Sequence, residues 1–260
     1  MREPWFFDSH AHYDNRRFQE DQPELLASME ENSIGLIMNV GCDLTSSLRS
    51  IRLAEQYAFI YASVGSHPDD ADKVDEGLVE MYRNLAAHSK VMAIGEIGLD
   101  YYYEDVPREK QQDAFRMQMA LAQELDMPVI VHQRDAYEDT LRIVDEFPAV
   151  KGVFHCFSGS LEYAKEVVKR GWCVGFTGVI TFKNARKAVE VAQWVPLDRL
   201  LIETDCPYMA PEPFRGRRCD STMVPRMAEK IAELRGLPVE QIARITRENA
   251  MRVFRIGAVL

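Results

Sequence analysis

Histidines and carboxylates recur at regular points along this chain, and together they have the composition of a metal site. Five of the six histidines follow short apolar runs, and two acidic residues end further runs of the same kind. Neutral imidazoles combined with carboxylates suit zinc, manganese, iron or nickel, whereas magnesium prefers a site richer in oxygen. The residues placed in this way are His10, His12, His67, Glu96, His132, His155 and Asp205.

The spacing of His10 and His12 predicts that both contribute to one site. Side chains along a strand alternate between its faces, so two imidazoles two residues apart point to the same side and can share one ion. Glu96 can bridge two ions because a carboxylate has two oxygens. Each residue alone has an ordinary explanation: a hydrogen-bonded core histidine, a buried ion pair for Glu96, or a helix cap for an Asp after a strand. Six such ligands at successive strand ends are hard to obtain from packing alone, which favours a metal centre.

Short β-branched or aromatic runs alternate with longer helical patterns, and their spacing is that of βα units. The predicted strands are 5–8, 35–40, 60–66, 91–96, 129–132, 152–155, 172–176 and 200–204. The clearest helical patterns are 108–125, 137–146, 161–170, 223–235 and 239–253.

This alternation predicts an α/β fold, a (β/α)8 barrel of the TIM type. An open doubly wound sheet is the competing fold, but it usually carries a Gly-x-Gly-x-x-Gly turn after its first strand. Here the first strand ends in Asp8-Ser9-His10-Ala11-His12, without glycine. In a barrel, the active site forms at the carboxyl ends of the strands, where the polar residues named above are predicted to lie.

Length and composition agree with one such barrel. The chain has 260 residues, and a TIM barrel typically takes about 250, so we expect a single domain over residues 1–260. The net charge of −10 argues against a sequence-independent coat on nucleic acid, although a local basic pocket remains compatible with it.

Cysteine usage and hydropathy predict the cellular setting. The five cysteines include no Cys-x-x-Cys pair, which argues against a disulfide framework and a thiolate zinc site. Free thiols suit a reducing compartment. We find no run of about 18 apolar residues and no signal-peptide pattern, so we expect a cytoplasmic protein without a membrane partner.

The sequence resembles the TatD family of metal-dependent deoxyribonucleases, within the amidohydrolase-like metal hydrolases, because it carries several of the family's motifs in the same order. The resemblance covers essentially the whole chain, starting at the Asp8–His12 segment. The further motifs are Gly65-Ser66-His67-Pro68, Gly95-Glu96-Ile97-Gly98-Leu99-Asp100-Tyr101-Tyr102, the segment 128–136, His155-Cys156-Phe157-Ser158-Gly159-Ser160, Glu203-Thr204-Asp205-Cys206-Pro207-Tyr208 and Glu248-Asn249-Ala250.

The resemblance implies a barrel that carries two divalent ions and hydrolyses DNA phosphodiester bonds, often as an exonuclease. By the family pattern, the first ion would be held by His10, His12, Glu96 and Asp205. The second ion would be held by Glu96, His132 and His155. By composition alone, zinc, manganese, magnesium, iron and nickel are all candidates for these ions. Two ions about 3.5–4 Å apart can activate a water, so Glu96 and Asp205 are the catalytic candidates, with Asp205 as general base.

Substrate contacts are predicted from His67 and from a loop after the last strand that carries Arg215, Arg217 and Arg218. The alternative for the loop is a solvated basic surface. Family members usually continue this loop with an Asn-Glu-Pro run, whereas this chain has Cys219-Asp220-Ser221, which bears on substrate preference and removes no ligand. Glu203, two residues before Asp205, either orients a ligand or is a charge of the barrel core.

The leading hypothesis is therefore a metal-dependent nuclease whose partner is DNA, as single strands or ends, with no obligate protein partner. A second enzyme class would use the same site to cleave an ester or C–N bond, such as an aminoacyl ester or a cyclic amide. A non-catalytic binding module is the third reading, and the full set of polar groups at one rim argues against it.

Overall fold

The computed structural model describes residues 5–103 and 105–257. In this part of the chain, eight parallel strands form one sheet in sequence order. The strands are β1 Phe6–Ala11, β2 Ile34–Val40, β3 Ile60–Val64, β4 Val91–Asp100, β5 Val129–Arg134, β6 Gly152–Phe154, β7 Cys173–Phe176 and β8 Leu200–Ile202. The sheet closes because Asp205 N donates to His10 O and His12 N donates to Cys206 O, both at 2.9 Å. The predicted barrel is confirmed.

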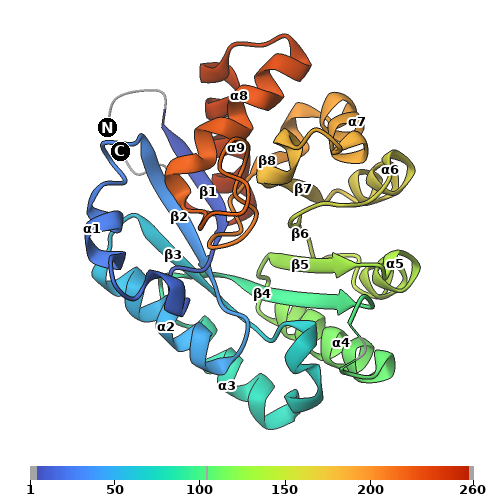
Figure 1. The fold of residues 1–260 in the computed structure, drawn as a ribbon. Helices are drawn as coiled ribbons and strands as arrows, with labels where there is room; N and C mark the ends of the chain where they lie inside the picture. The colour runs from blue at the N-terminus through green and yellow to red at the C-terminus, as the bar shows by residue number, and fades with distance from the viewer. Residues whose placement is uncertain (1–4, 104, 258–260) are drawn as a thin grey trace.

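Helices surround the strands and cover the outside of the barrel (Figure 1). Those predicted from the sequence are present, and two of them, Tyr137–Glu146 and Val239–Val253, have the predicted bounds. The α-helices are α1 Gln22–Ala27, α2 Leu44–Gln56, α3 Glu76–Ala86, α4 Arg108–Glu124, α5 Tyr137–Glu146, α6 Leu161–Lys169, α7 Arg186–Trp194, α8 Val224–Arg235 and α9 Val239–Val253. Short 3₁₀ helices are η1 Arg16–Phe18, η2 Pro68–Lys73, η3 Gly178–Thr181, η4 Leu197–Arg199 and η5 Ser221–Met223.

Apolar side chains fill the barrel interior. One buried cluster contains Phe7, Met38, Ile130 and Leu201 together with Phe254, which follows α9. Because this cluster joins strands from different sides of the barrel, it lies inside the sheet. A second, larger cluster packs the other strand faces against the helices, as the two-residue period of a strand requires.

Several strand boundaries differ from the sequence prediction, and the ends of β4 and β8 bear on the site. The prediction that Glu96 ends its strand is wrong, because β4 continues to Asp100. The pairing of β4 with β5 shifts register between Ile94 and Ile97, so Glu96 lies at an irregularity within the strand. Conversely, β8 ends at Ile202, and Asp205 follows it with a left-handed backbone (φ 57°).

The structure adds two further observations. No helix in the described ranges is long and apolar enough to cross a membrane. All five cysteines are free thiols, and Cys173, Cys206 and Cys219 are buried, as expected for packing residues.

Candidate metal centre

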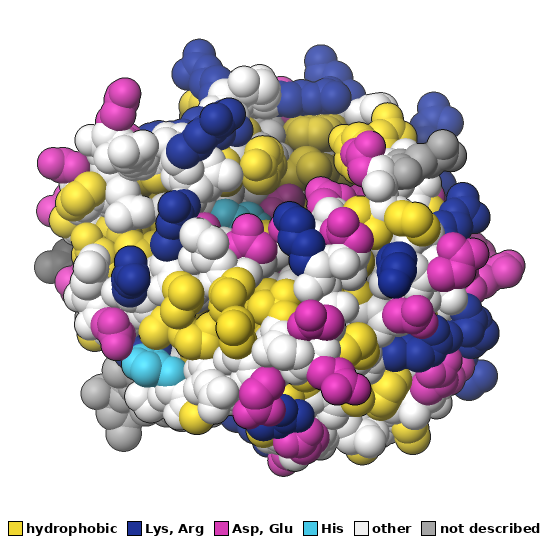
Figure 2. Space-filling model, turned by 90° about the horizontal axis from the view of Figure 1, so that it is seen from below, with side chains coloured by type: hydrophobic (Ala, Val, Ile, Leu, Met, Phe, Trp, Pro, Cys, Tyr) yellow, Lys and Arg dark blue, Asp and Glu magenta, His cyan; other side chains and the backbone are white. Residues whose placement is uncertain are grey.

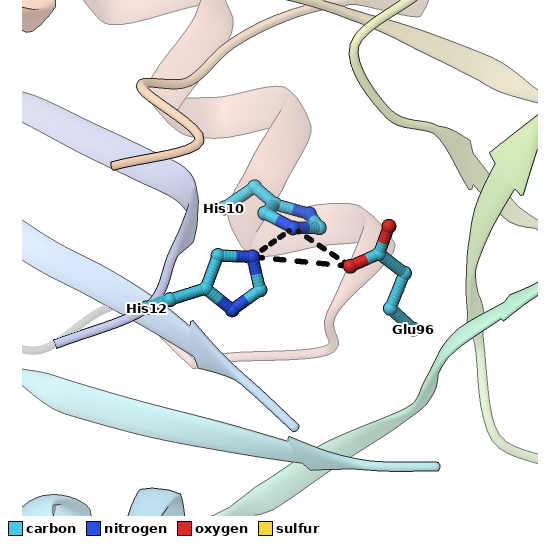
Figure 3. Close-up of side chains that lie close together, drawn as sticks. All are labelled: His10, His12 and Glu96. Atoms are coloured by element: carbon cyan, nitrogen blue, oxygen red, sulfur yellow. Dashed lines mark hydrogen bonds and ion pairs between the residues drawn. The ribbon is translucent and has the colours of Figure 1, made fainter. Parts of the chain in front are cut away.

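The first part of the site is formed by His10 in β1, His12 just after it and Glu96 in β4. Figure 3 shows His10, His12 and Glu96 pointing toward one another. The Nε2 atoms of His10 and His12 are 3.1 Å apart, and they lie 3.4 and 3.8 Å from Oε2 of Glu96. The prediction that the two histidines share one face is therefore confirmed.

The other oxygen of Glu96 faces a second pair of imidazoles. Its Oε1 lies 2.6 Å from Nε2 of His155 and 2.8 Å from Nδ1 of His132. These two nitrogens are themselves 3.1 Å apart. The Glu96 carboxylate thus lies between two histidine pairs, with one oxygen directed at each.

Asp205 approaches the first pair from the segment after β8. Its Oδ1 is 3.4 Å from Nε2 of His12 and 3.8 Å from Nε2 of His10. A left-handed backbone is uncommon for a residue other than glycine, and such conformations gather at functional sites. All six predicted ligands therefore converge on one site.

The donor set fits divalent cations. Three groups of three side chains each offer ligand atoms within 4.8 Å of one another. Imidazole lone pairs that face carboxylate oxygens repel them unless a proton or a metal ion lies between. The electrostatic potential in the site attracts positive charge. Burial alone would lower the pKa of His132, but hydrogen bonds to Asp100 and Glu96 raise that pKa to about 9.

The two carboxylates are held in the charged form. Burial alone would raise the pKa of Glu96, but the charges of His155 and His10 lower that pKa well below its usual range. Burial would likewise raise the pKa of Asp205, but the hydrogen bond from His12 and the charges of His10 and His155 together lower that pKa. Both groups are therefore ready to bind a cation at neutral pH.

Neighbouring groups fix which nitrogen of two histidines faces the site. His132 lies with Nε2 3.0 Å from Oδ2 of Asp100, which leaves Nδ1 toward Glu96. His12 lies with Nδ1 2.9 Å from the carbonyl oxygen of Val40, which leaves Nε2 toward the site. Such partners orient metal ligands and select their tautomer.

Asp100 and Cys42 belong to the site although neither was predicted there. Asp100 lies four residues after Glu96 in the same strand, so the period of the strand was the available signal. Cys42 follows β2, and its Sγ lies 3.7 Å from Nδ1 of His12 and 3.6 Å from Oε2 of Glu96. Its signal was the position after a strand, at the same rim as the ligands.

Glu203 is a buried acid beneath the ligands. It accepts hydrogen bonds from Cys156 N at 2.5 Å and from Ser9 Oγ at 3.2 Å, and Oε1 is 3.8 Å from Nδ1 of His155. Burial raises its pKa to about 7. Gly175 makes room for it, since a Cβ there would lie 2.4 Å from Oε2. Glu203 therefore packs in the barrel and also lies beside the predicted ligand His155. Its surroundings agree in part with each hypothesis from the sequence, a charge of the barrel core and a residue that orients a ligand.

The loop that departs from the family pattern faces the core. Cys219 and Ser221 are buried, and Ser221 Oγ donates to Oδ2 of Asp8 at 2.6 Å. Asp8 also accepts from Oγ1 of Thr204 at 2.6 Å, and burial raises its pKa to about 6. The Cys219 and Ser221 side chains therefore do not face entering substrate, because Cys219 is buried and Ser221 binds the loop to β1.

The predicted substrate residues differ in how near they lie to the metal cluster. His67 adjoins the cluster, with Nε2 3.8 Å from Oε1 of Glu96. Arg218 is paired with Asp21 through two contacts, at 2.7 and 2.5 Å. Arg215 and Arg217 are exposed and lie over the rings of Phe182 and Phe214. Within residues 5–103 and 105–257, none of the three arginines lines the cavities of about 260 and 630 Å³ that open onto the cluster.

Two cavities open onto the cluster. The metal mouth, of about 260 Å³, is lined by His67, Asp69, Asp70 and Tyr208 beside the ligands. The side chamber, of about 630 Å³, extends from His132, His155 and Asp205 toward η3 and the start of α7. In Figure 2, histidine and acidic side chains lie at the bottom of a hollow bordered by hydrophobic and basic side chains.

Replacing Glu96 tests whether the cluster holds metal. Glu96→Gln removes the charge between the two histidine pairs, so the purified protein should lose most of its bound metal. Elemental analysis after dialysis against limiting metal measures this loss. His88→Gln is the matched control, because His88 pairs with Glu55 on the surface at 3.2 Å. Equal metal content in both variants would contradict a metal centre at Glu96.

Replacing Ser221 tests whether its loop serves the fold. Ser221→Ala removes a donor from the buried Asp8 carboxylate, which should lower the free energy of unfolding by about 1–3 kcal/mol. Urea denaturation measures the change, with the exposed Ser89→Ala as control. A raised KM with unchanged stability would instead mean that Ser221 contacts substrate.

Known proteins resemble this chain in sequence and in fold. Residues 7–255 match the family described as "TatD related DNase". The uncharacterized metal-dependent hydrolase YabD of Bacillus subtilis is 45% identical over 253 residues, which cover 96% of this chain and 99% of that protein. A Pectobacterium carotovorum protein named 3'-5' ssDNA/RNA exonuclease TatD is 32% identical over 263 residues, covering 96% of this chain and 100% of that protein.

A solved structure extends the likeness to three dimensions. YjjV, a TatD homologue from Escherichia coli, superposes with a TM-score of 0.91 at 32% sequence identity, covering 97% of this chain and 98% of that chain. Together with the cluster of histidines and acids able to bind metal, these matches establish that the chain belongs to the TatD family of metal-dependent hydrolases.

Proposed function

We propose that this hydrolase cleaves phosphodiester bonds of DNA, acting at strand ends with two divalent ions. The observation that carries the proposal is the position of Glu96, whose two oxygens face separate histidine pairs. A two-ion site suits displacement at phosphorus, since both the attacking and the leaving oxygen need stabilisation. The exonuclease name of the Pectobacterium relative supports the same substrate class.

In this proposal the two ligand sets share Glu96. His10, His12, Glu96 and Asp205 would hold one ion, and Glu96, His132 and His155 would hold the other. Bound divalent ions would supply Lewis acidity and lower the pKa of water at the site. His67 Nε2 is close enough to Glu96 Oε1, at 3.8 Å, to contact a phosphate that reaches the cluster.

Asp205 is the proposed general base. Its carboxylate is ionised because the hydrogen bond from His12 and the charges of His10 and His155 together outweigh the effect of burial on its pKa. An ionised carboxylate at the cluster can take the proton of the attacking water. Neighbouring Thr204 binds Asp8 through its backbone N–H at 2.9 Å, and this contact fixes the segment that carries Asp205.

An ester or C–N bond hydrolase is the alternative. The apolar side chains of the chamber, such as Phe157 and Ile180, would also accept an uncharged acyl group. Three basic residues of the same chamber, Arg134, Arg186 and Lys187, favour a phosphate-bearing substrate.

Replacing Asp205 tests the reaction and its base. The wild-type protein should release nucleotides from a single-stranded oligonucleotide when metal is present and stop when a chelator is added. Asp205→Asn should cut kcat on the order of 10²-fold or more, because it removes the proton acceptor. His88→Gln should retain wild-type turnover. Near-normal turnover of a folded, metal-loaded Asp205→Asn protein would exclude Asp205 as base.

Charge removal from the arginine loop tests its contact with a polyanion. Arg215→Gln/Arg217→Gln should raise KM for an oligonucleotide and flatten its dependence on salt. Arg218 is left in place because it pairs with Asp21. Lys165→Gln/Lys169→Gln, on exposed positions of α6, removes the same charge as a control. Equal KM values for the two variants would mean that the loop is only a solvated surface.

A further inference from the structure

The side chamber adjoins the metal centre and has a composition of its own. It includes His132, His155 and Asp205, so anything inside it reaches the reacting centre. Its volume, about 630 Å³, falls within the range of small-molecule sites, roughly 300–1,000 Å³. A mononucleotide is within the size that such a cavity takes.

One wall of the chamber is apolar. Phe157, Phe176 and Ile180 are 7%, 2% and 1% exposed, so they are fixed by the packing around them. Phe157 is further held by stacking on Tyr163, with ring centroids 5.9 Å apart. Rigid aromatic and aliphatic surfaces of this kind pack against the flat face of a base.

Basic side chains border the same chamber. Arg134, Arg186 and Lys187 line it, and Asp205 is the one acid among its described lining residues. In the described ranges, none of these three cations forms a salt bridge. Their donors are therefore available to an anionic group.

Arg134 is held without a carboxylate partner. Its guanidinium lies 3.7 Å from the ring centroid of Tyr102 and 5.2 Å from that of Tyr103. The backbone N–H groups of these tyrosines donate to Oδ1 of Asp100 at 2.9 and 3.4 Å, while Oδ2 of Asp100 contacts His132. One carboxylate thus positions both a ligand histidine and the tyrosines that hold Arg134.

The metal mouth has the opposite charge. Asp69 and Asp70 line it, so a polyanion is repelled there. The chamber, with its three cations, is the side on which a phosphate chain is attracted.

We propose that the side chamber holds the base of the terminal nucleotide of an unpaired strand, and that Arg134 contacts a phosphate of that strand. The proposal rests on the proposed function. A base packed against Phe157 and Ile180 inside a cavity cannot remain paired with a complementary strand. The chamber would therefore select single-stranded ends.

Substrates that differ only in the terminal base test this assignment. Two single-stranded oligonucleotides are compared, one unmodified and one whose terminal residue is abasic, at the end that the wild-type enzyme attacks. Because the base packs on side chains, kcat/KM should be roughly 5- to 150-fold lower for the abasic end. A blunt duplex should also be cleaved more slowly than the single strand.

Two variants connect the effect to the chamber. Ala188→Leu fills space beside the apolar wall, and it should reduce the preference for the unmodified end toward 1. Arg186→Glu/Lys187→Glu, on exposed positions, should raise KM for the oligonucleotide, and it serves if Ala188→Leu does not fold. Lys165→Glu/Lys169→Glu makes the same charge change on α6 and should leave KM unchanged.

The outcomes separate the two proposals. If wild type degrades DNA but cleaves both ends equally well, the chamber assignment is overturned while the nuclease function stands. Equal KM values for the two double variants would also overturn it. If wild type releases no nucleotide with any divalent metal, both proposals fail. Hydrolysis of an aminoacyl ester that Ala188→Leu blocks would then assign the chamber to an acyl group.

Discussion

Everything in this site depends on bringing electron-rich side chains into contact around one carboxylate. Oε1 of the buried Glu96 lies 2.6 Å from Nε2 of His155, and Oε2 lies 3.4 Å from Nε2 of His10. Such contacts are unfavourable unless positive charge lies between them. The closed barrel imposes them, because it brings β1, β4, β5, β6 and β8 to one rim regardless of their separation in sequence. Metal affinity is then the consequence of a rigid fold holding mutually repelling groups.

Buried acids around the cluster reinforce that constraint. Asp8, Asp100 and Glu203 each lie next to a ligand or its backbone, and each is offset by specific donors. Asp8 joins β1 to Thr204 and Ser221, so the segments on both sides of Asp205 are fixed to the strand that carries the histidines. These hydrogen bonds determine where the ligands lie. The negative charge of the buried acids makes the site attractive to cations.

The sequence predicted the barrel and the convergence of the ligands because both follow from local periodicity. A period of two placed His10 and His12 on one face, and the alternation of strands with helices placed all the ligands at one rim. Contacts between distant segments were not predictable in this way. The pairing of Arg218 with Asp21 joins residues 197 positions apart, and Ser221 meets Asp8 across 213. Nothing in the loop sequence indicates that one arginine is already bound and that its neighbour Ser221 faces inward.

The distribution of charge bears on how an acidic protein can act on a polyanion. With a net charge of −10, the chain repels a nucleic acid at long range, so binding depends on short-range contacts. Around the cluster the acids Asp69 and Asp70 lie on one side, while Arg134, Arg186 and Lys187 lie on the other. A DNA strand bound by its middle would have to pass both the acidic and the basic side of the cluster, and the acidic side disfavours phosphate. Under the proposed function, this asymmetry favours a strand that ends at the metal centre, and so it gives a physical reason for cleavage from an end.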